Sequence, residues 1–275
     1  QKANKSSASY NTKRGDNKLV SQLQLVSTTD LYFICQMIDG VTRNPRNYLR
    51  NIEDIFGDMS SSILVRAYPK FTCFHVFVEM LISSVIYEDA DRAVNRPGEY
   101  WVDYLLRSNN MSHSSVNPVE FEQCDGYEYL EALQQKDIIA ELSEAVSKQV
   151  FYVLFSNRGT LSAFGHLVAG YVLGTAPSFA PEAFNTSGYL SRASVPAWAK
   201  SAVFHRDKGR CILCQADLTK FFSQQSRIHY DHIVPLAHGG MNCVSNLQLT
   251  CSRCNLDKGA RSAATSQEYE VWYDY

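Results

Sequence analysis

Two cysteine pairs of the form CxxC constrain this chain of 275 residues more than any other feature of its sequence. The pairs are Cys211/Cys214 and Cys251/Cys254, and a long loop separates them. Two such pairs are typical of a tetrahedral zinc site. Because all four ligands would be thiolates, no coordination position is left for substrate or water. We therefore expect a structural Zn²⁺ ion that stabilises a small domain with little hydrophobic core.

The rest of the sequence argues against disulfides, secretion and membrane insertion. The remaining cysteines are scattered, at Cys35, Cys73, Cys124 and Cys243. No charged n-region followed by a secretory h-region opens the chain, and a disulfide framework would be unusual without one. No run reaches the roughly 18 apolar residues that a membrane helix needs. We expect a soluble, cytoplasmic protein without membrane contact, in which Cys243 is not a metal ligand.

Composition and patterning divide the chain into four parts. Hydrophobic residues make up 45% and charged residues 20%, which excludes a disordered tail protein, a collagen-like fibre and a coiled-coil rod. Apolar residues recur at helical spacing over 19–175 without sustained strand alternation, which predicts an all-α domain. The polar, basic residues 1–18 are expected to form a flexible arm. Residues 176–195, with recurring Gly and Pro, are expected to form a linker, and 196–275 a second, small domain.

Local signals place two of the expected helices. Asp137 is expected to open a helix that closes near Gly159. A short and very apolar helix is expected after it, over Leu161–Leu173.

A narrow polar stripe runs along another expected helix, Phe71–Tyr87. Its members recur every three to four positions, and they are Thr72, His75, Glu79 and Ser83. His75 and Glu79, one turn apart, are candidates for metal ligands or for a proton relay. The interpretation we favour is a set of buried polar groups whose hydrogen bonds are satisfied at a helix interface.

Charge is unevenly distributed along the chain. Residues 191–261 contain ten lysines and arginines against four aspartates, whereas the whole chain has a formal net charge of −2. The remainder of the chain is therefore acidic. We expect contact with a polyanion in the C-terminal part, and a protein partner, a regulatory ligand or self-association through the acidic helical part.

The segment between and after the cysteine pairs is rich in side chains that can carry chemistry. It contains, in order, His229, Asp231, His232, Gly239-Gly240, Asn246, Asn255 and Lys258. The β-branched residues of Arg227–Pro235 predict a strand. Asp231 and His232 are adjacent on it, so their side chains leave on opposite faces unless the strand ends or twists there. Gly239-Gly240 permits a turn after the strand.

These residues, in this order, resemble the HNH endonuclease family, in the subgroup with a four-cysteine zinc knuckle. The resemblance covers about residues 196–262, roughly a quarter of the chain. It implies an α+β multidomain fold, with a mostly α-helical N-terminal domain followed by a small zinc-stabilised ββα-metal (HNH) domain. In such a unit the predicted strand comes first and the helix starts around the second cysteine pair.

The resemblance also implies an active site. Asp231 and Asn255 would hold a catalytic Mg²⁺ or Mn²⁺ ion, which suits hard oxygen ligands, although the family often has histidine at the position of Asn255. His232 would be the general base that takes a proton from the attacking water, because the pKa of imidazole lies near working pH. The ion would stabilise charge on the scissile phosphate and on the departing 3′ oxygen. Asn246 would fix His232 by holding the loop between strand and helix with side-chain to backbone hydrogen bonds.

Several neighbouring residues allow more than one role. His229 lies two positions before the expected metal-binding aspartate and either touches metal or substrate or is structural. Arg253 and Lys258 either contact phosphate or belong to a solvated helix face. His205 and His238 are expected to be structural or exposed.

Two functions from different classes follow. The leading hypothesis is a metal-dependent endonuclease that hydrolyses phosphodiester bonds, above all in DNA. The alternative is a non-catalytic, zinc-stabilised nucleic-acid-binding or protein adaptor module, which would not need Asp231, His232, Asn246 and Asn255 together. A helical region joined to an HNH nuclease also resembles effectors of bacterial restriction or antiphage systems, which are held back until a partner or signal arrives.

Overall fold

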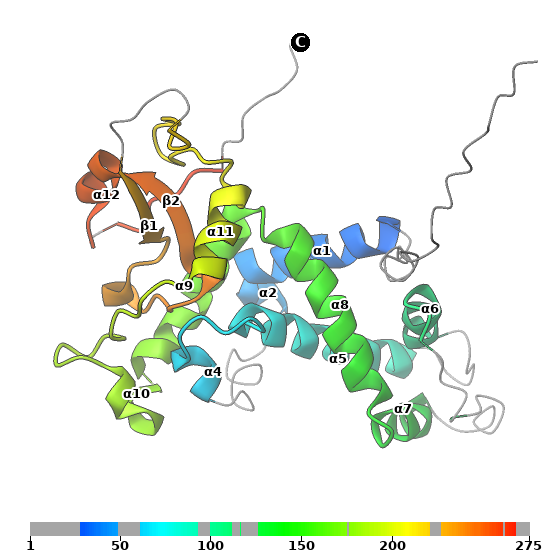
Figure 1. Cartoon of the computed structure of the whole chain (residues 1–275). Coiled ribbons are helices and arrows are strands. Elements are labelled where there is room, and N and C mark those ends of the chain that lie inside the picture. The colour runs from blue at the N-terminus through cyan, green and yellow to red at the C-terminus, as the bar shows by residue number, and fades with distance from the viewer. Residues whose placement is uncertain are drawn as a thin grey trace, which may run out of the picture.

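The computed structural model describes residues 28–48, 61–92, 100–111, 116, 126–174, 176–220, 227–260 and 262–267. The expected basic arm 1–18 and Cys124 lie outside these residues. Figure 1 shows a helical part next to a smaller part that contains the strands. This arrangement confirms the predicted fold class, a mostly helical N-terminal part followed by a small α+β region. The exact boundaries proposed between the domains stay a prediction.

Helices alone form the described N-terminal part of the chain. In chain order they are α1 (Thr28–Arg43), α2 (Pro45–Tyr48), α4 (Ser61–Val65), α5 (Cys73–Arg92), α6 (Trp101–Ser108), α7 (Gly126–Gln134), α8 (Ile138–Leu154) and α9 (Arg158–Gly174). Helix α5 lies at the centre and packs most extensively against α8. Its Phe74 and Phe77 are fully buried, and their rings lie 4.9 and 5.2 Å from the ring of Phe164 in α9. Each such burial stabilises the fold by about 1.5–3 kcal/mol.

The expected helix end near Gly159 is wrong. Helix α8 ends at Leu154, and Gly159 is the second residue of α9, which includes the expected helix Leu161–Leu173. A Cβ atom on Gly159 would lie 2.7 Å from the side chain of Gln267 and 2.8 Å from that of Arg43. The glycine is therefore explained by close packing of distant segments rather than by helix termination.

The polar stripe agrees with the favoured interpretation at Thr72, His75 and Ser83, which have polar partners at or beside the α5–α8 interface. The Nδ1 atom of His75 accepts a hydrogen bond from the Thr72 backbone N–H at 3.0 Å and lies 2.8 Å from the Thr72 hydroxyl. The His75 ring stacks on Phe151 of α8, with centroids 4.1 Å apart. The hydroxyls of Ser83 and Ser143 are 3.2 Å apart across the α5–α8 contact. Among the described residues, no metal-binding cluster of His, Cys, Asp or Glu includes His75.

The segment expected to be a linker carries short elements and packs against both parts. It contains α10 (Ala176–Phe179), the 3₁₀ helix η3 (Pro181–Ala183) and an isolated bridge between Phe184 and Leu190. Leu190 is buried with the helical core, whereas Ala193 and Val195 pack against the core of the C-terminal part. This crossing segment, 184–195, therefore lies between the helical bundle and the strands.

The C-terminal part is built around a two-stranded antiparallel sheet. Its elements are α11 (Ala197–Arg206), β1 (Ile228–His232), the 3₁₀ helices η4 (Leu236–His238) and η5 (Val244–Asn246), β2 (Leu247–Cys251) and α12 (Ser252–Lys258). The register pairs Ile228 with Cys251 and His232 with Leu247. Helix α12 follows β2 without a gap and packs on both strands. The order of these elements is the ββα unit that the resemblance implies.

A buried ion-pair network fastens the helical part to the sheet. The Asp207 carboxylate, at the end of α11, accepts from Arg158 Nη1 at 3.1 Å and from Arg206 Nε at 2.8 Å. It also accepts from the backbone N–H of Leu249 in β2 at 2.8 Å. All three charged side chains are almost completely buried. Removing one partner of such a network costs about 3–5 kcal/mol, because it leaves an uncompensated buried charge.

Helix α9 lies directly against the loop that connects β1 to β2. A Cβ atom on Gly165 would lie 2.9 Å from the Val234 side chain, and one on Gly239 would lie 2.6 Å from the backbone oxygen of Ala169. Gly239 has a φ of +81°, so it needs glycine for its conformation as well. The helical part therefore supports the loop that follows the predicted catalytic strand.

Candidate functional site

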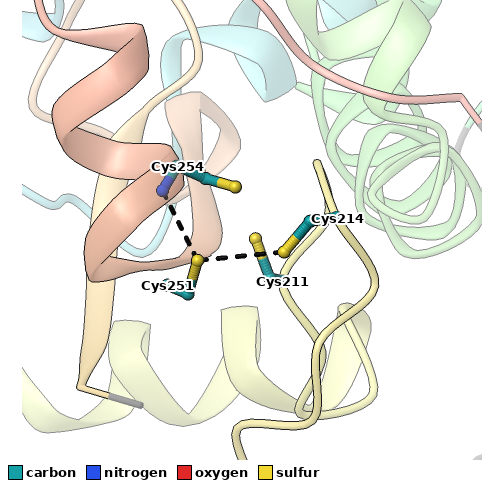
Figure 2. Close-up of side chains that lie close together, drawn as sticks. All are labelled: Cys211, Cys214, Cys251 and Cys254. Atoms are coloured by element: carbon teal, nitrogen blue, oxygen red, sulfur yellow. Dashed lines mark hydrogen bonds between the residues drawn. The ribbon is translucent and has the colours of Figure 1, made fainter.

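The four paired cysteines converge on one point. Figure 2 shows Cys211 and Cys214 on one loop, facing Cys251 and Cys254 at the start of α12. Their sulfur atoms all lie within 4.8 Å of one another, and the Cys214 and Cys251 sulfurs are 3.8 Å apart. Sulfurs about 2.3 Å from a zinc ion at tetrahedral corners are about 3.8 Å apart, whereas a disulfide needs about 2.05 Å. The cluster therefore fits a possible zinc site.

Local backbone geometry explains why these cysteines meet. The Gln215 N–H donates to the Cys211 carbonyl at 2.8 Å, and Gln215 has a φ of +59°, which closes the first pair into a tight turn. Cys251 caps α12, and its sulfur accepts from the Cys254 N–H at 3.4 Å. Burial raises the pKa of the Cys214 and Cys254 thiols. A divalent cation would supply the charge that keeps all four as thiolates.

Three of the predicted site residues line one cavity. Asp231 and His232 stand at the end of β1, and the strand stops there, so adjacent side chains reach the same cavity of about 440 Å³. Asn255 of α12 lines it as well. The remaining lining residues come from the crossing segment, from the loop after β1 and from α12, and include Arg192, Tyr189 and Leu256. The cavity therefore lies where sheet, helix and crossing segment meet.

His232 is a buried imidazole beside the Asn242 side chain. Its exposed fraction is 3%, and its ring nitrogens make no hydrogen bond of good geometry with the described residues. Burial, together with the positive charge of Arg192, lowers its pKa to about 4, although the Asp231 carboxylate and a hydrogen bond with the Asn242 side chain act in the opposite direction. The ring is therefore neutral at pH 7, and one of its nitrogens has a lone pair that can accept a proton.

The Asp231 carboxylate is held on one side only. Its Oδ2 atom accepts from Lys258 Nζ at 2.9 Å and from Gln248 Nε2 at 3.0 Å. Within the described residues, Oδ1 and the Asn255 side chain have no hydrogen-bond partner. Two hard oxygen donors beside one cavity fit a Mg²⁺ or Mn²⁺ ion that keeps several waters. The residues present therefore fit the catalytic ion that the resemblance implies.

Neither role considered for Lys258, a phosphate contact or a place on a solvated helix face, agrees with the structure. Its side chain is neither on a solvated face nor available for phosphate, because it is 1% exposed. Its ammonium group donates to the His232 carbonyl at 2.7 Å as well as to Asp231. Arg253, by contrast, lies on the solvated face of α12, where its Nε is 3.7 Å from the Asp257 carboxylate. Lys258 therefore joins the helix to the strand end that carries the predicted catalytic residues.

Asn246 makes side-chain to backbone hydrogen bonds, as predicted, but in the loop between β1 and β2 rather than between strand and helix. Its Oδ1 atom accepts from the Val234 N–H at 2.8 Å, and its Nδ2 donates to the carbonyls of Val234 and Met241 at 2.9 and 3.0 Å. Its own carbonyl accepts from the Ile233 N–H at 2.7 Å. These bonds tie the residues after His232 to the start of β2, and they leave the Asn246 side chain no free donor.

The remaining candidates lie outside the cavity. His229 Nε2 is 3.0 Å from the Ser252 hydroxyl, and its side chain faces a second hollow described below. His205 and His238 are exposed. Cys243 is buried with its sulfur 3.0 Å from the Ser245 hydroxyl, outside the cysteine cluster.

Three residues that line the cavity or bond to Asp231 are not predicted from the sequence. Arg192 and Tyr189 line the cavity from the expected linker. The Gly, Pro and Ser residues of this segment give no periodic pattern from which the orientation of its side chains could be predicted. Gln248 stands in β2 opposite Asp231, and only the strand register brings it within hydrogen-bonding distance.

Comparisons with known proteins agree with this geometry. The family model described as "HNH endonuclease" matches residues 211–261. No curated protein and no solved structure matches the chain. Among the described helices, none is both long and apolar enough to cross a membrane. An HNH domain indicates a nuclease-type function and interaction with nucleic acid. Residues 211–261 therefore match the HNH endonuclease family model, and they are joined to a mostly helical N-terminal part and contain the cysteines of a possible zinc site.

Proposed function

We propose that this chain is a metal-dependent endonuclease that hydrolyses phosphodiester bonds, above all in DNA. The observation that supports it most is the convergence of Asp231, His232 and Asn255 on one cavity, with no well-formed hydrogen bond to either ring nitrogen of His232. An adaptor domain gains nothing from a buried imidazole whose hydrogen bonds are incompletely satisfied, which costs stability because its polar atoms are desolvated.

In this proposal, His232 is the general base. Its neutral ring accepts a proton from the attacking water at a nitrogen that faces the cavity. The negative charge of a bound phosphate raises the pKa of the imidazole from its low value, which strengthens it as a base. Lys258 holds the His232 carbonyl and Asn246 holds the loop after it, so the ring keeps its orientation.

Asp231 and Asn255 would hold the Mg²⁺ or Mn²⁺ ion through their side-chain oxygens. When bound, the ion supplies stabilisation of the charge that develops on the phosphate and on the departing 3′ oxygen. The four cysteines would hold a structural Zn²⁺ ion that keeps β2 and α12 in register with the strand of His232.

Nicking of a supercoiled plasmid tests the proposal. The wild type should nick in Mg²⁺ or Mn²⁺ and stop in EDTA. His232→Ala should keep its zinc and its circular dichroism spectrum but lose nicking by a factor of about 100 or more, since general-base catalysis contributes about 10²–10⁴. Equal nicking by this variant would remove His232 from its role. A wild type that cleaves neither DNA nor RNA in either ion would favour the adaptor function.

We also propose that the helical part restrains the nuclease until a partner or signal arrives, as in a cytoplasmic antiphage or restriction effector. The buried Arg158–Asp207 pair and the contact of α9 with the loop near Gly239 support this, because a change in the bundle would reach the loop that fixes His232. The purified chain alone should then nick slowly. Rapid nicking without any partner would contradict the restraint.

A further inference from the structure

A second hollow, of about 420 Å³, adjoins the catalytic cavity. The two share Arg192 and His232 as lining residues. The rest of its lining comes from residues 193–195 of the crossing segment, from Lys200 of α11 and from residues 228–230 of β1. None of these described lining residues is acidic, whereas Arg192 and Lys200 are cationic at pH 7. A positively charged hollow therefore continues directly from the predicted cleavage point.

Arg192 is held in place by its backbone. The buried Asn242 side chain donates to the Ser191 carbonyl at 2.9 Å and accepts from the Ala193 N–H at 3.3 Å. The Ser191 N–H donates in turn to the Ala183 carbonyl at 2.8 Å. The residues on both sides of Arg192 are thus bonded to fixed parts of the molecule. The arginine leaves the crossing segment at a defined point beside His232.

The cationic groups of this hollow are available to a ligand. The side chains of Arg192 and Lys200 are exposed. Neither makes an ion pair or a side-chain hydrogen bond with the described residues, in contrast to Arg158, Arg206 and Lys258, which are bonded to carboxylates. A guanidinium group binds phosphate oxygens through two parallel N–H donors, and an ammonium group binds them as a compact charge.

We infer that Arg192 and Lys200 form a phosphate-binding subsite for the nucleotide next to the scissile bond. The inference rests on the proposed function. A polynucleotide strand that crosses His232 from one hollow to the other brings one phosphate to Asp231 and Asn255 and its neighbour to Arg192. Both subsite residues precede the segment 211–261 that matches the family model, so the crossing segment and α11 would add substrate binding to the HNH unit.

Binding measured without cleavage tests this subsite. In a His232→Ala background with Mg²⁺, a short fluorescent oligonucleotide is titrated at several salt concentrations, single-stranded and double-stranded. Adding Arg192→Ala should weaken binding about tenfold, as expected for loss of a charged hydrogen bond. It should also reduce the slope of log Kd against log salt by about one. Lys200→Ala should act in the same direction, and Arg192→Lys should restore part of the loss.

The matched control is Arg253→Ala, which removes the same charge from the exposed face of α12, outside both hollows. It should change binding less than twofold. Equal effects of Arg192→Ala and Arg253→Ala, in a chain whose wild type binds and cleaves, would overturn the subsite and leave the nuclease proposal intact. A wild type that neither binds nor cleaves any oligonucleotide would overturn both.

Discussion

Lys258 is the residue on which the geometry of the site most depends. A single buried ammonium group bonds the carboxylate of the predicted metal ligand and the carbonyl of the predicted base, 2.9 and 2.7 Å away. It reaches both from α12, the helix that also carries Asn255. One side chain therefore links the strand end that carries Asp231 and His232 to the helix that carries Asn255. Its positive charge also compensates the negative charge of Asp231.

Replacing Lys258 with Met should cost both stability and activity. The substitution leaves the buried Asp231 carboxylate with Gln248 alone, and breaking a buried pair costs about 3–5 kcal/mol. Chemical denaturation should show this loss. The control Arg253→Met breaks an exposed ion pair on the same helix and should change stability by less than about 1 kcal/mol. Similar losses of unfolding free energy in the two variants would show that the buried Lys258–Asp231 pair stabilises the fold no more than an exposed pair.

Protonation of His232 should make stability depend on pH. Burial lowers its pKa from 6.5 to about 4, so the unfolded chain binds the proton more readily between these values. Its contribution to stability is therefore complete above pH 6.5 and is lost as the pH falls towards 4. Between pH 7.5 and pH 5 this loss amounts to about 2 kcal/mol.

Urea denaturation of the wild type and of His232→Ala at the two pH values measures this contribution. Burial also lowers the pKa of His75 to about 4, and it raises that of Glu79 to about 7, which changes stability in the opposite sense. Both groups are present in both proteins, so their effects cancel in the comparison. If the two proteins showed the same pH dependence, the pKa of His232 would not be lowered in the folded protein.

At the scale of elements, the glycines of α9 differ in their surroundings, since Gly165 faces the site loop and Gly170 faces open space. A Cβ atom on Gly165 would lie 2.9 Å from Val234, whereas one on Gly170 would have nothing within 4 Å. Alanine is intrinsically better than glycine in a helix by about 1 kcal/mol. The same substitution at the two positions therefore separates helix propensity from contact with the loop.

Gly165→Ala should destabilise the protein by about 1–3 kcal/mol, because overpacking pushes α9 away from the loop. It should also lower nicking, since Asn246 fixes that loop. Gly170→Ala should stabilise the protein by up to about 1 kcal/mol without altering nicking. Urea denaturation and the plasmid assay measure both effects. Equal stabilisation by the two variants would mean that α9 does not press on the loop.

The elements that sequence predicts best are those whose signal is local. Alternating β-branched residues predict β1, and helical spacing predicts α8 and α9. The helix end expected near Gly159 is wrong because this glycine makes room for the side chains of Arg43 and Gln267. Both residues are distant from it in sequence. For the same reason the role of Arg192 was not predictable, since its place beside His232 depends on bonds from Asn242.

For the molecule as a whole, the cysteine cluster lies beside the hydrophobic core of the C-terminal part. That core includes Val203, Leu218 and Leu249, and Cys211 and Cys251 are themselves among its buried residues. The spacing of the cysteines predicted this cluster, because ligand spacing in such sites is a local property. The ion pair of Arg158 with Asp207, which attaches the sheet to the bundle, joins residues far apart in sequence, so no local pattern predicts it.

Loss of the zinc ion should unfold the C-terminal part. The purified chain should contain about one tightly bound zinc ion, measured by elemental analysis. Cys211→Ser should lower the zinc content and the yield of folded protein, because three thiolates no longer close the site. Cys243→Ser, at a buried cysteine outside the cluster, should keep the zinc. Full zinc content and normal folding of Cys211→Ser would contradict a structural four-cysteine site.

The most direct measurement of the catalytic centre is anomalous diffraction from crystals soaked in Mn²⁺. The proposed chemistry predicts a manganese peak in the cavity, contacted by oxygens of Asp231 and Asn255 and facing the ring of His232. It also predicts that Asn255→Ala removes this peak while the metal at the four cysteines stays. Crystals with metal at the cysteines but no manganese between Asp231 and Asn255 would contradict a hydrolytic centre at this site.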